Sequence, residues 1–85
     1  MQAVEIYTSP FCGYCHAAKR LLTAKGVAFT EIDVIREPEK RAEMQARAAG
    51  RHTVPQIFIG ETHVGGCDEL HALDHRGELD RLLKG

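Results

Sequence analysis

The sequence predicts a single α/β domain, and three observations support this. The chain has 85 residues, enough for one hydrophobic core and too few for two. Short apolar runs with the period of two that is typical of strands are separated by runs with the helical period of about 3.6. In chain order these runs give β-α-β-α-β-β-α. No linker or repeat divides them, so we expect one domain over residues 1–85.

The first predicted strand and helix flank a pair of cysteines. Residues Val4–Tyr7 alternate apolar and polar side chains, which predicts a strand, and residues 8–11 are expected to turn. A helix should run from about Gly13 to Lys25, with Gly26 as its cap. Its apolar stripe consists of Ala17, Ala18, Leu21 and Leu22. The first cysteine is therefore expected where a strand ends and a helix begins.

A second strand and a second helix follow. Residues 27–34 alternate well enough for a strand, with Thr30, Ile32 and Val34 on one side. Glu37 and Pro38 should open a helix, because proline is tolerated in the first turn, and Gly50 should close it. The buried stripe of this helix is expected to be Ala42, Ala46 and Ala49. Two strands joined by a helix in this order should be parallel, with a right-handed crossover.

The second half of the chain begins with a predicted hairpin. Residues Gln56–Ile59 form a short apolar strand, Gly60-Glu61 suits a type II′ turn, and residues 62–64 return as an edge strand. A helix should follow Gly65-Gly66. The last two amphipathic segments are marked by leucines at positions 70 and 73, and then at 79, 82 and 83.

Composition excludes several classes of function. The net charge is −1 and there is no run of Lys or Arg, which argues against a nucleic-acid partner. No apolar run is long enough to cross a membrane, so we expect no membrane partner. The N-terminal residues lack the basic and apolar regions of a secretory signal, so we expect a cytoplasmic location. Three cysteines, an odd number, do not fit a secreted disulfide framework.

The pattern Cys12-Gly13-Tyr14-Cys15 carries the chemistry that the sequence predicts. The first turn of a helix has unpaired N–H groups and the positive end of the helix dipole, and both stabilise a thiolate. Cys15 follows one helical turn later, close enough to form a disulfide with Cys12 after small movements. A CxxC pair at a strand-to-helix corner therefore indicates a redox-active dithiol that opens and closes.

Other interpretations of the cysteines and histidines remain open at this stage. Cys12 and Cys15 could bind zinc together with His63 and Cys67, although the spacer is longer than zinc modules use. With His16, the pair also matches the C-x-x-C-H signature of c-type haem attachment, which normally accompanies export. The thiols could instead be inert and buried. A fourth possibility is a metal held by His71 and His75, which are spaced i, i+4.

Two further motifs suggest a ligand groove. The first is Thr53-Val54-Pro55. A cis bond before this proline would turn the backbone N–H and C=O of Val54 outward, where an extended peptide could pair with them. The alternative is an ordinary trans proline at the start of a strand. In Gly65-Gly66-Cys67-Asp68, the glycines allow close backbone approach and the following helix N-terminus can hold a carboxylate. Asp68 could pair with an ammonium group or simply cap the helix.

Together, the motifs around Cys12, Val54 and Asp68 resemble the glutaredoxin family over essentially the whole chain. The resemblance implies a thioredoxin fold, with a four-stranded mixed sheet flanked by helices. It also implies glutathione-dependent reduction of protein disulfides and of glutathionylated proteins, with glutathione as co-substrate and electron donation to ribonucleotide reductase. Disulfide-containing and glutathionylated proteins would be the partners. We expect a monomer, and a dimer only if a cluster is bound.

The resemblance assigns roles residue by residue. Cys12 would be the nucleophile and Cys15 the resolving thiol. The segment Thr53-Val54-Pro55 would pair with the cysteinyl unit of glutathione. Gly66, Cys67 and Asp68 would hold its γ-glutamyl head, and Tyr14 would line the groove.

Two positions depart from the family pattern. Gly13 replaces the usual proline between the cysteines, and some relatives with a small residue there bind a [2Fe–2S] cluster between two protomers through the first cysteine and glutathione. Ser9 stands where many relatives have a lysine that binds the glycyl carboxylate of glutathione. We expect Arg41 to supply that charge instead. Except for a cluster on Cys12, no metal site is expected.

Three functions follow from these observations. The first is a glutathione-dependent disulfide oxidoreductase. The second is a dimer that binds a glutathione-ligated [2Fe–2S] cluster for storage or transfer, which Gly13 favours. The third is a related redox protein reduced by thioredoxin reductase, which the Gly66-Cys67-Asp68 corner disfavours.

Overall fold

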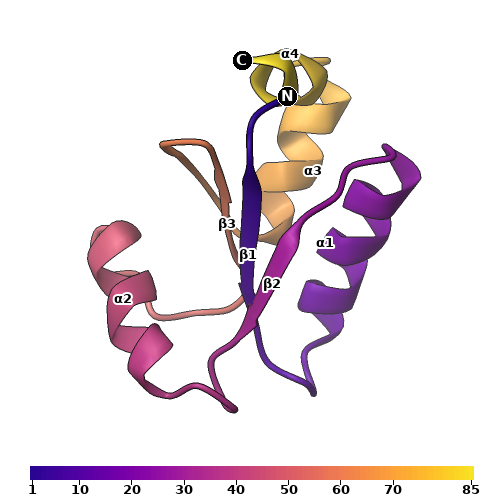
Figure 1. The fold of residues 1–85 in the computed structure, drawn as a ribbon. Helices are drawn as coiled ribbons and strands as arrows, with labels where there is room; N and C mark the ends of the chain where they lie inside the picture. The colour runs from indigo at the N-terminus through magenta and orange to yellow at the C-terminus, as the bar shows by residue number, and fades with distance from the viewer.

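A four-stranded mixed sheet lies at the centre of the protein in the computed structural model, which describes all residues from 1 to 85 (Figure 1). The strands are β1 (Val4–Thr8), β2 (Thr30–Asp33), β3 (Gln56–Ile59) and β4 (Thr62–Gly65). Their order across the sheet is β2-β1-β3-β4. Strand β1 is parallel to β2 and antiparallel to β3, and β3 is antiparallel to β4. The predicted parallel pair and hairpin are confirmed, and the arrangement is the thioredoxin fold.

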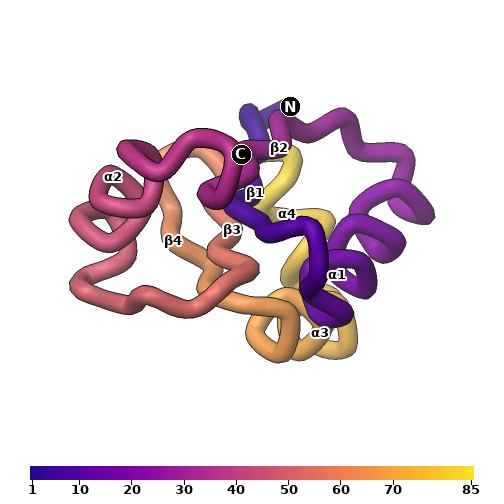
Figure 2. Tube along the Cα trace, turned by 90° about the horizontal axis from the view of Figure 1, so that it is seen from below, coloured from indigo at the N-terminus to yellow at the C-terminus, as the bar shows by residue number.

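Four helices cover the two faces of this sheet. They are α1 (Gly13–Ala24), α2 (Glu39–Arg47), α3 (Cys67–His75) and α4 (Leu79–Lys84). Helix α2 covers one face, while α1 and α3 lie together on the other, as both views show (Figures 1 and 2). The ends of the chain lie close together, at the end of the sheet away from the β1–α1 turn. No helix is long and apolar enough to span a membrane.

The central strand β1 is buried on both sides because helices cover both faces. Ile6 faces the larger core cluster, which includes side chains of α1, α3 and α4, and Tyr7 faces the smaller one under α2. Each is 0% exposed, and burying a side chain of this size contributes roughly 1.5–3 kcal/mol. The Tyr7 hydroxyl donates to Glu43 and accepts from Arg47, so its polar atom is satisfied. Strand β1 is thereby fixed against both layers, and the turn that follows it is anchored.

The predicted buried stripe of the second helix is wrong. Ala42, Ala46 and Ala49 are exposed, whereas Met44 and Ala48 are buried against the sheet. The longer Met side chain removes more apolar surface from water than alanine does, so the helix turns that face inward. Ala49 also lies beyond the helix, in the left-handed region at φ 54°.

Two other boundaries differ in detail from the expectation. Strand β2 covers only residues 30–33 of the predicted 27–34, and Thr30 is exposed whereas Ile32 and Val34 are buried. The expected turn at Gly60-Glu61 is confirmed, since Ile59 pairs with Thr62. Gly60 has φ +58° and Glu61 does not have a positive φ, as a type II′ turn requires.

Candidate active site beside the first helix

Cys12 lies at the N-cap of α1, where the chain leaves β1 and turns into the helix. Its backbone is extended, at φ −122° and ψ 107°, and the backbone N–H of Cys15 donates to Cys12 Sγ over 3.1 Å. The thiol is partly exposed and not in a disulfide. A helix N-terminus stabilises negative charge through its unpaired N–H groups and its dipole. Cys12 is therefore an accessible thiol placed where a thiolate is favoured.

Cys15 differs from Cys12 in its surroundings. It is 0% exposed, within the first turn of α1. Burial raises the pKa of the Cys15 thiol to about 12, and its hydrogen bond with Cys12 adds to the shift. Because the thiolate is the nucleophile, Cys15 is inert while it remains buried and protonated. Of the pair, Cys12 is thus the thiol that can attack first.

A groove adjoins Cys12 on the side of Val54. Its volume is about 280 Å³, and it is lined by Tyr14, Arg51, Thr53, Val54, Pro55, Gly66, Cys67, Asp68 and Glu69. The Val54–Pro55 bond is cis. Cys12 Sγ donates to the carbonyl of Val54 over 3.7 Å, and the Val54 N–H makes no hydrogen bond within the chain. The structure thus brings Tyr14 and both predicted ligand motifs around one cavity.

Arg51 and Glu69 also line this groove, and sequence reasoning missed both. Arg51 Nη2 lies 3.4 Å from Glu69 Oε1, which also accepts the N–H of Gly66 at the start of α3. A Cβ at Gly65, where φ is +114°, would lie 2.6 Å from that oxygen, so glycine is required there. Glu69 stands three residues after the N-cap Gly66, the spacing at which the Glu of a capping box reaches back to the N-cap N–H. Glycine has no side chain to form the other half of the box, so the sequence signal was only half present. No local signal marks Arg51.

Asp68 is exposed in the first turn of α3 and does not cap the helix. The N-cap is Gly66, and the side chain that reaches back is that of Glu69. Asp68 makes no hydrogen bond or ion pair within the chain. Its carboxylate therefore remains free to pair with a cation at the groove.

Arg41 and Ser9 do not line the groove. Arg41 Nη1 donates to the carbonyl of His52 over 3.0 Å, just before the groove segment begins. Ser9 precedes Cys12 in the turn after β1, and its backbone N–H interacts with the Cys15 thiol. Of the two arginines considered for the groove, Arg41 and Arg51, only Arg51 lines it.

The structure does not gather the ligands that a zinc or histidine-bound metal would need. No group of three or more His, Cys, Asp or Glu side chains has a metal-binding arrangement. His63 instead pairs with Gln56 over 2.7 Å, and the Sγ of Cys67 lies 3.4 Å from His71 Nδ1. Cys67 is buried, and burial raises the pKa of its thiol.

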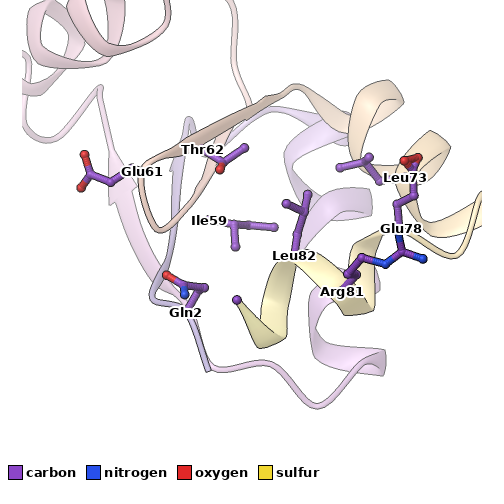
Figure 3. Close-up of a pocket in the computed structure, with 9 residues that line it drawn as sticks. Gln2, Ile59, Glu61, Thr62, Leu73, Glu78, Arg81 and Leu82 are labelled. Atoms are coloured by element: carbon purple, nitrogen blue, oxygen red, sulfur yellow. The ribbon is translucent and has the colours of Figure 1, made fainter.

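A larger hollow lies at the opposite end of the sheet, beside the chain termini (Figure 3). It measures about 560 Å³ and is lined by Gln2, Ile59, Glu61, Thr62, Leu73, Glu78, Arg81, Leu82 and Gly85. None of these residues is a cysteine or a histidine, so it offers no redox-active thiol. We therefore assign the chemistry to the smaller groove, which adjoins Cys12.

Comparisons with known proteins agree with this geometry. The family model described as glutaredoxin matches residues 4–64. The chain is 61% identical to a glutaredoxin of Pseudomonas aeruginosa over 83 residues, which cover 98% of each protein. It is 58% identical to glutaredoxin 3 of Escherichia coli over 84 residues, which cover 99% of this chain and 100% of that protein.

Solved structures show the same fold. The solution structure of glutaredoxin from Brucella melitensis is 61% identical, with a TM-score of 0.86, and the match covers 99% of this chain and 90% of that one. A buckwheat glutaredoxin–glutathione complex is 30% identical, with a TM-score of 0.87, covering 98% and 77%. A structure described as "Metal Binding of Glutaredoxins" is 60% identical, with a TM-score of 0.75, covering 99% and 90%.

Proposed function

The chain belongs to the glutaredoxin family, a family of thiol–disulfide oxidoreductases, and we propose that glutathione is its electron donor and part of its substrate. In this proposal the protein reduces glutathione mixed disulfides and protein disulfides. The observation that supports it most is the groove beside Cys12, which combines an unpaired backbone N–H at Val54, a guanidinium at Arg51 and a free carboxylate at Asp68. Glutathione carries the complementary groups, namely a peptide backbone, two carboxylates and an ammonium.

The placement of glutathione follows from these groups. The cysteinyl unit would pair with the backbone of Val54, which brings its sulfur next to Cys12. The γ-glutamyl ammonium would pair with Asp68, and its carboxylate would lie at the N-terminus of α3, where N–H groups and the helix dipole favour an anion. The Arg51 guanidinium lies beside Gly66 and Glu69 at this same corner, so it would also bind the γ-glutamyl carboxylate. Arg41, as the sequence suggested, would bind the glycyl carboxylate. The buckwheat complex supports glutathione as the ligand.

Reduction of a glutathionylated protein needs only Cys12. The Cys12 thiolate attacks the glutathione sulfur, a new Cys12–glutathione disulfide forms, and the protein leaves as a thiolate that takes up a proton. A second glutathione, as thiolate, then attacks the glutathione sulfur of that mixed disulfide. Oxidised glutathione leaves, and the Cys12 thiolate is restored where the helix N-terminus stabilises it.

Reduction of a protein disulfide also uses Cys15. Cys12 attacks one sulfur of the disulfide and forms a mixed disulfide with the protein. Cys15 then loses its proton and attacks Cys12 Sγ, which releases the second protein thiol and leaves a Cys12–Cys15 disulfide. Two glutathione molecules reduce that disulfide in turn. The disulfide of ribonucleotide reductase is one protein substrate that the family resemblance adds to this proposal.

Binding of a [2Fe–2S] cluster is a second candidate, and Gly13 favours it. An added Cβ at Gly13 would meet nothing within 4 Å, so the surface beside Cys12 is open. Cys15 and Cys67 are buried, so one chain presents only the Cys12 thiol to a cluster. Two chains and two glutathione thiolates would then complete the ligand set. The 60% identical structure described as "Metal Binding of Glutaredoxins" supports considering this candidate. A visible absorption band after anaerobic purification with glutathione, lost in Cys12→Ser, would support it.

The deciding experiment measures reduction of a glutathionylated peptide with glutathione as the only reductant. We expect turnover with glutathione and little or none with thioredoxin reductase and NADPH. The Cys12→Ser variant, which should fold, provides the control and should be inactive. Turnover with thioredoxin reductase alone, or equal activity of Cys12→Ser, would contradict the proposed function.

A further inference from the structure

The loop that forms one wall of the groove is held in an unusual way. Residues 52–55 make no backbone–backbone hydrogen bond, although Thr53, Val54 and Pro55 line the groove and His52 directly precedes them. Instead, three successive carbonyls each accept from a side chain. The carbonyl of His52 accepts from Arg41, that of Thr53 from Gln56 and that of Val54 from the Cys12 thiol. The position of this wall therefore depends on side chains rather than on the sheet.

Gln56 makes the most buried of these contacts. It is 0% exposed at the start of β3, and its Nε2 donates to Thr53 O over 3.0 Å and to Thr53 Oγ1 over 3.3 Å. Its Oε1 lies 2.7 Å from His63 Nε2 on the neighbouring strand β4. Both ends of the amide are thus occupied, and they link the groove wall to the edge of the sheet.

The direction of these hydrogen bonds is fixed by chemistry. A carbonyl can only accept, so the end of Gln56 that faces Thr53 O must be the NH₂ group. The other end is then a carbonyl oxygen, and His63 must donate to it through a protonated Nε2. Burial lowers the pKa of His63, so the ring is neutral with its one proton on Nε2. His63 is also stacked on Phe58, with centroids 4.9 Å apart, which fixes the ring in place.

From this chain of contacts we propose that Gln56, supported by His63, is a positioning residue for the disulfide substrate. Its amide holds Thr53, and therefore the adjoining Val54 backbone, at the place where an extended peptide can pair beside Cys12. Gln56 does not line the groove, so it acts through Thr53 and not by contact with the ligand. The inference rests on the proposed function and adds a residue to which that function gives no role.

Two substitutions test the role of this amide. In Gln56→Met a side chain of similar length keeps the packing but donates nothing, so the carbonyl of Thr53 loses its partner and the wall can shift. We expect the KM for a glutathionylated peptide to rise about tenfold, with kcat changed less than about threefold, because the Val54 backbone would no longer be held in the position that binds the substrate. Alkylation of Cys12 by iodoacetamide should change less than about twofold, because its thiolate is stabilised by the N–H of Cys15 within α1.

In Gln56→Glu, the shape is retained but donation requires a protonated carboxyl. His63, whose Nε2 lies 2.7 Å from Gln56 Oε1, favours the ionised carboxylate at this position. A carboxylate only accepts hydrogen bonds, so at about pH 8 we expect the KM of Gln56→Glu to rise at least as much as that of Gln56→Met.

Ile57→Val is the matched control. Ile57 is the next residue of β3, is 0% exposed and belongs to the core cluster on the other face, so the change weakens the same strand without contacting the loop. Its KM should equal that of the wild type. An unchanged KM in folded Gln56→Met, an unchanged KM in folded Gln56→Glu, or an equal rise in Ile57→Val would each overturn the inference. An inactive wild type would instead overturn the proposed function.

Discussion

The burial of Cys15 predicts a specific pattern of chemical modification. Cys15 is 0% exposed, and burial raises the pKa of its thiol from 9.0 to about 12, with the hydrogen bond to Cys12 as the second cause. Alkylating reagents react with the thiolate, so the ionised fraction sets the rate. Unfolding exposes Cys15 and returns its pKa to the ordinary value. Comparing the folded and unfolded chains therefore isolates the effect of the fold.

The size of the effect follows from the two pKa values. At about pH 8, a thiol of pKa 9.0 is about one tenth ionised, whereas one of pKa about 12 is ionised to about one part in ten thousand. Cys15 should therefore react about 1000-fold more slowly in the native protein than in the unfolded chain. Exclusion of the reagent by the surrounding side chains would slow it further.

The assay is a pulse of iodoacetamide at about pH 8, with and without urea, followed by peptide mapping in a mass spectrometer. Early time points are needed, because alkylation of Cys12 changes the surroundings of Cys15. Cys12 serves as the internal standard, since it is partly exposed and should be labelled in the native protein. If native Cys15 were labelled within about tenfold of its rate in urea, the division between an attacking and a protected thiol would be refuted.

Three further predictions concern Cys15, His63 and Ala49. Cys15→Ser should keep reduction of a glutathionylated peptide within about threefold but lower reduction of a protein disulfide by tenfold or more, because only the second reaction needs a resolving thiol; equal losses would contradict this. Burial lowers the pKa of His63 from 6.5, so the unfolded chain binds more protons, and stability should be lost as the pH falls through 6.5. Measured by urea unfolding, the free energy of unfolding should fall less between about pH 7.5 and about pH 5.5 in His63→Gln than in the wild type. Ala49 has φ 54°, so Ala49→Gly should stabilise the protein by about 0.5–1 kcal/mol in urea unfolding. Ala46→Gly, at an exposed position within α2, should destabilise it by a similar amount, about 0.5–1 kcal/mol.

The order of strands and helices could be predicted because local patterns determine it. Each element has its own period, and its ends are marked by residues such as Pro38, Gly50 and Gly60. The second helix shows where such reasoning fails. Three alanines at helical spacing predicted its buried face, but the sheet receives Met44 and Ala48 instead. A weak alanine pattern does not fix the rotation of a helix when a larger apolar side chain lies on another face.

The groove was predictable where its residues stand in contiguous motifs. Thr53, Val54 and Pro55 form one motif and Gly66, Cys67 and Asp68 another, and the structure places both beside Cys12. Arg41 was expected there from its place on a flanking helix, but its guanidinium contacts the carbonyl of His52 instead. A helix can be placed near a site from sequence, whereas the reach and direction of a long side chain depend on the partners that the fold provides.

The residues missed in the sequence share a physical cause, which is that each acts through a partner distant in the chain. Arg51 meets Glu69, which is 18 residues away, and Gln56 meets His63 across a strand pair that does not exist before the hairpin forms. No local period or spacing encodes such a contact, and a glutamine at the start of an apolar strand looks like an ordinary boundary. Burial is what reveals its importance, because an amide at 0% exposure must have partners for both of its ends. Those partners are the groove wall and the sheet edge, so substrate affinity at Cys12 should depend on a residue that the substrate does not touch.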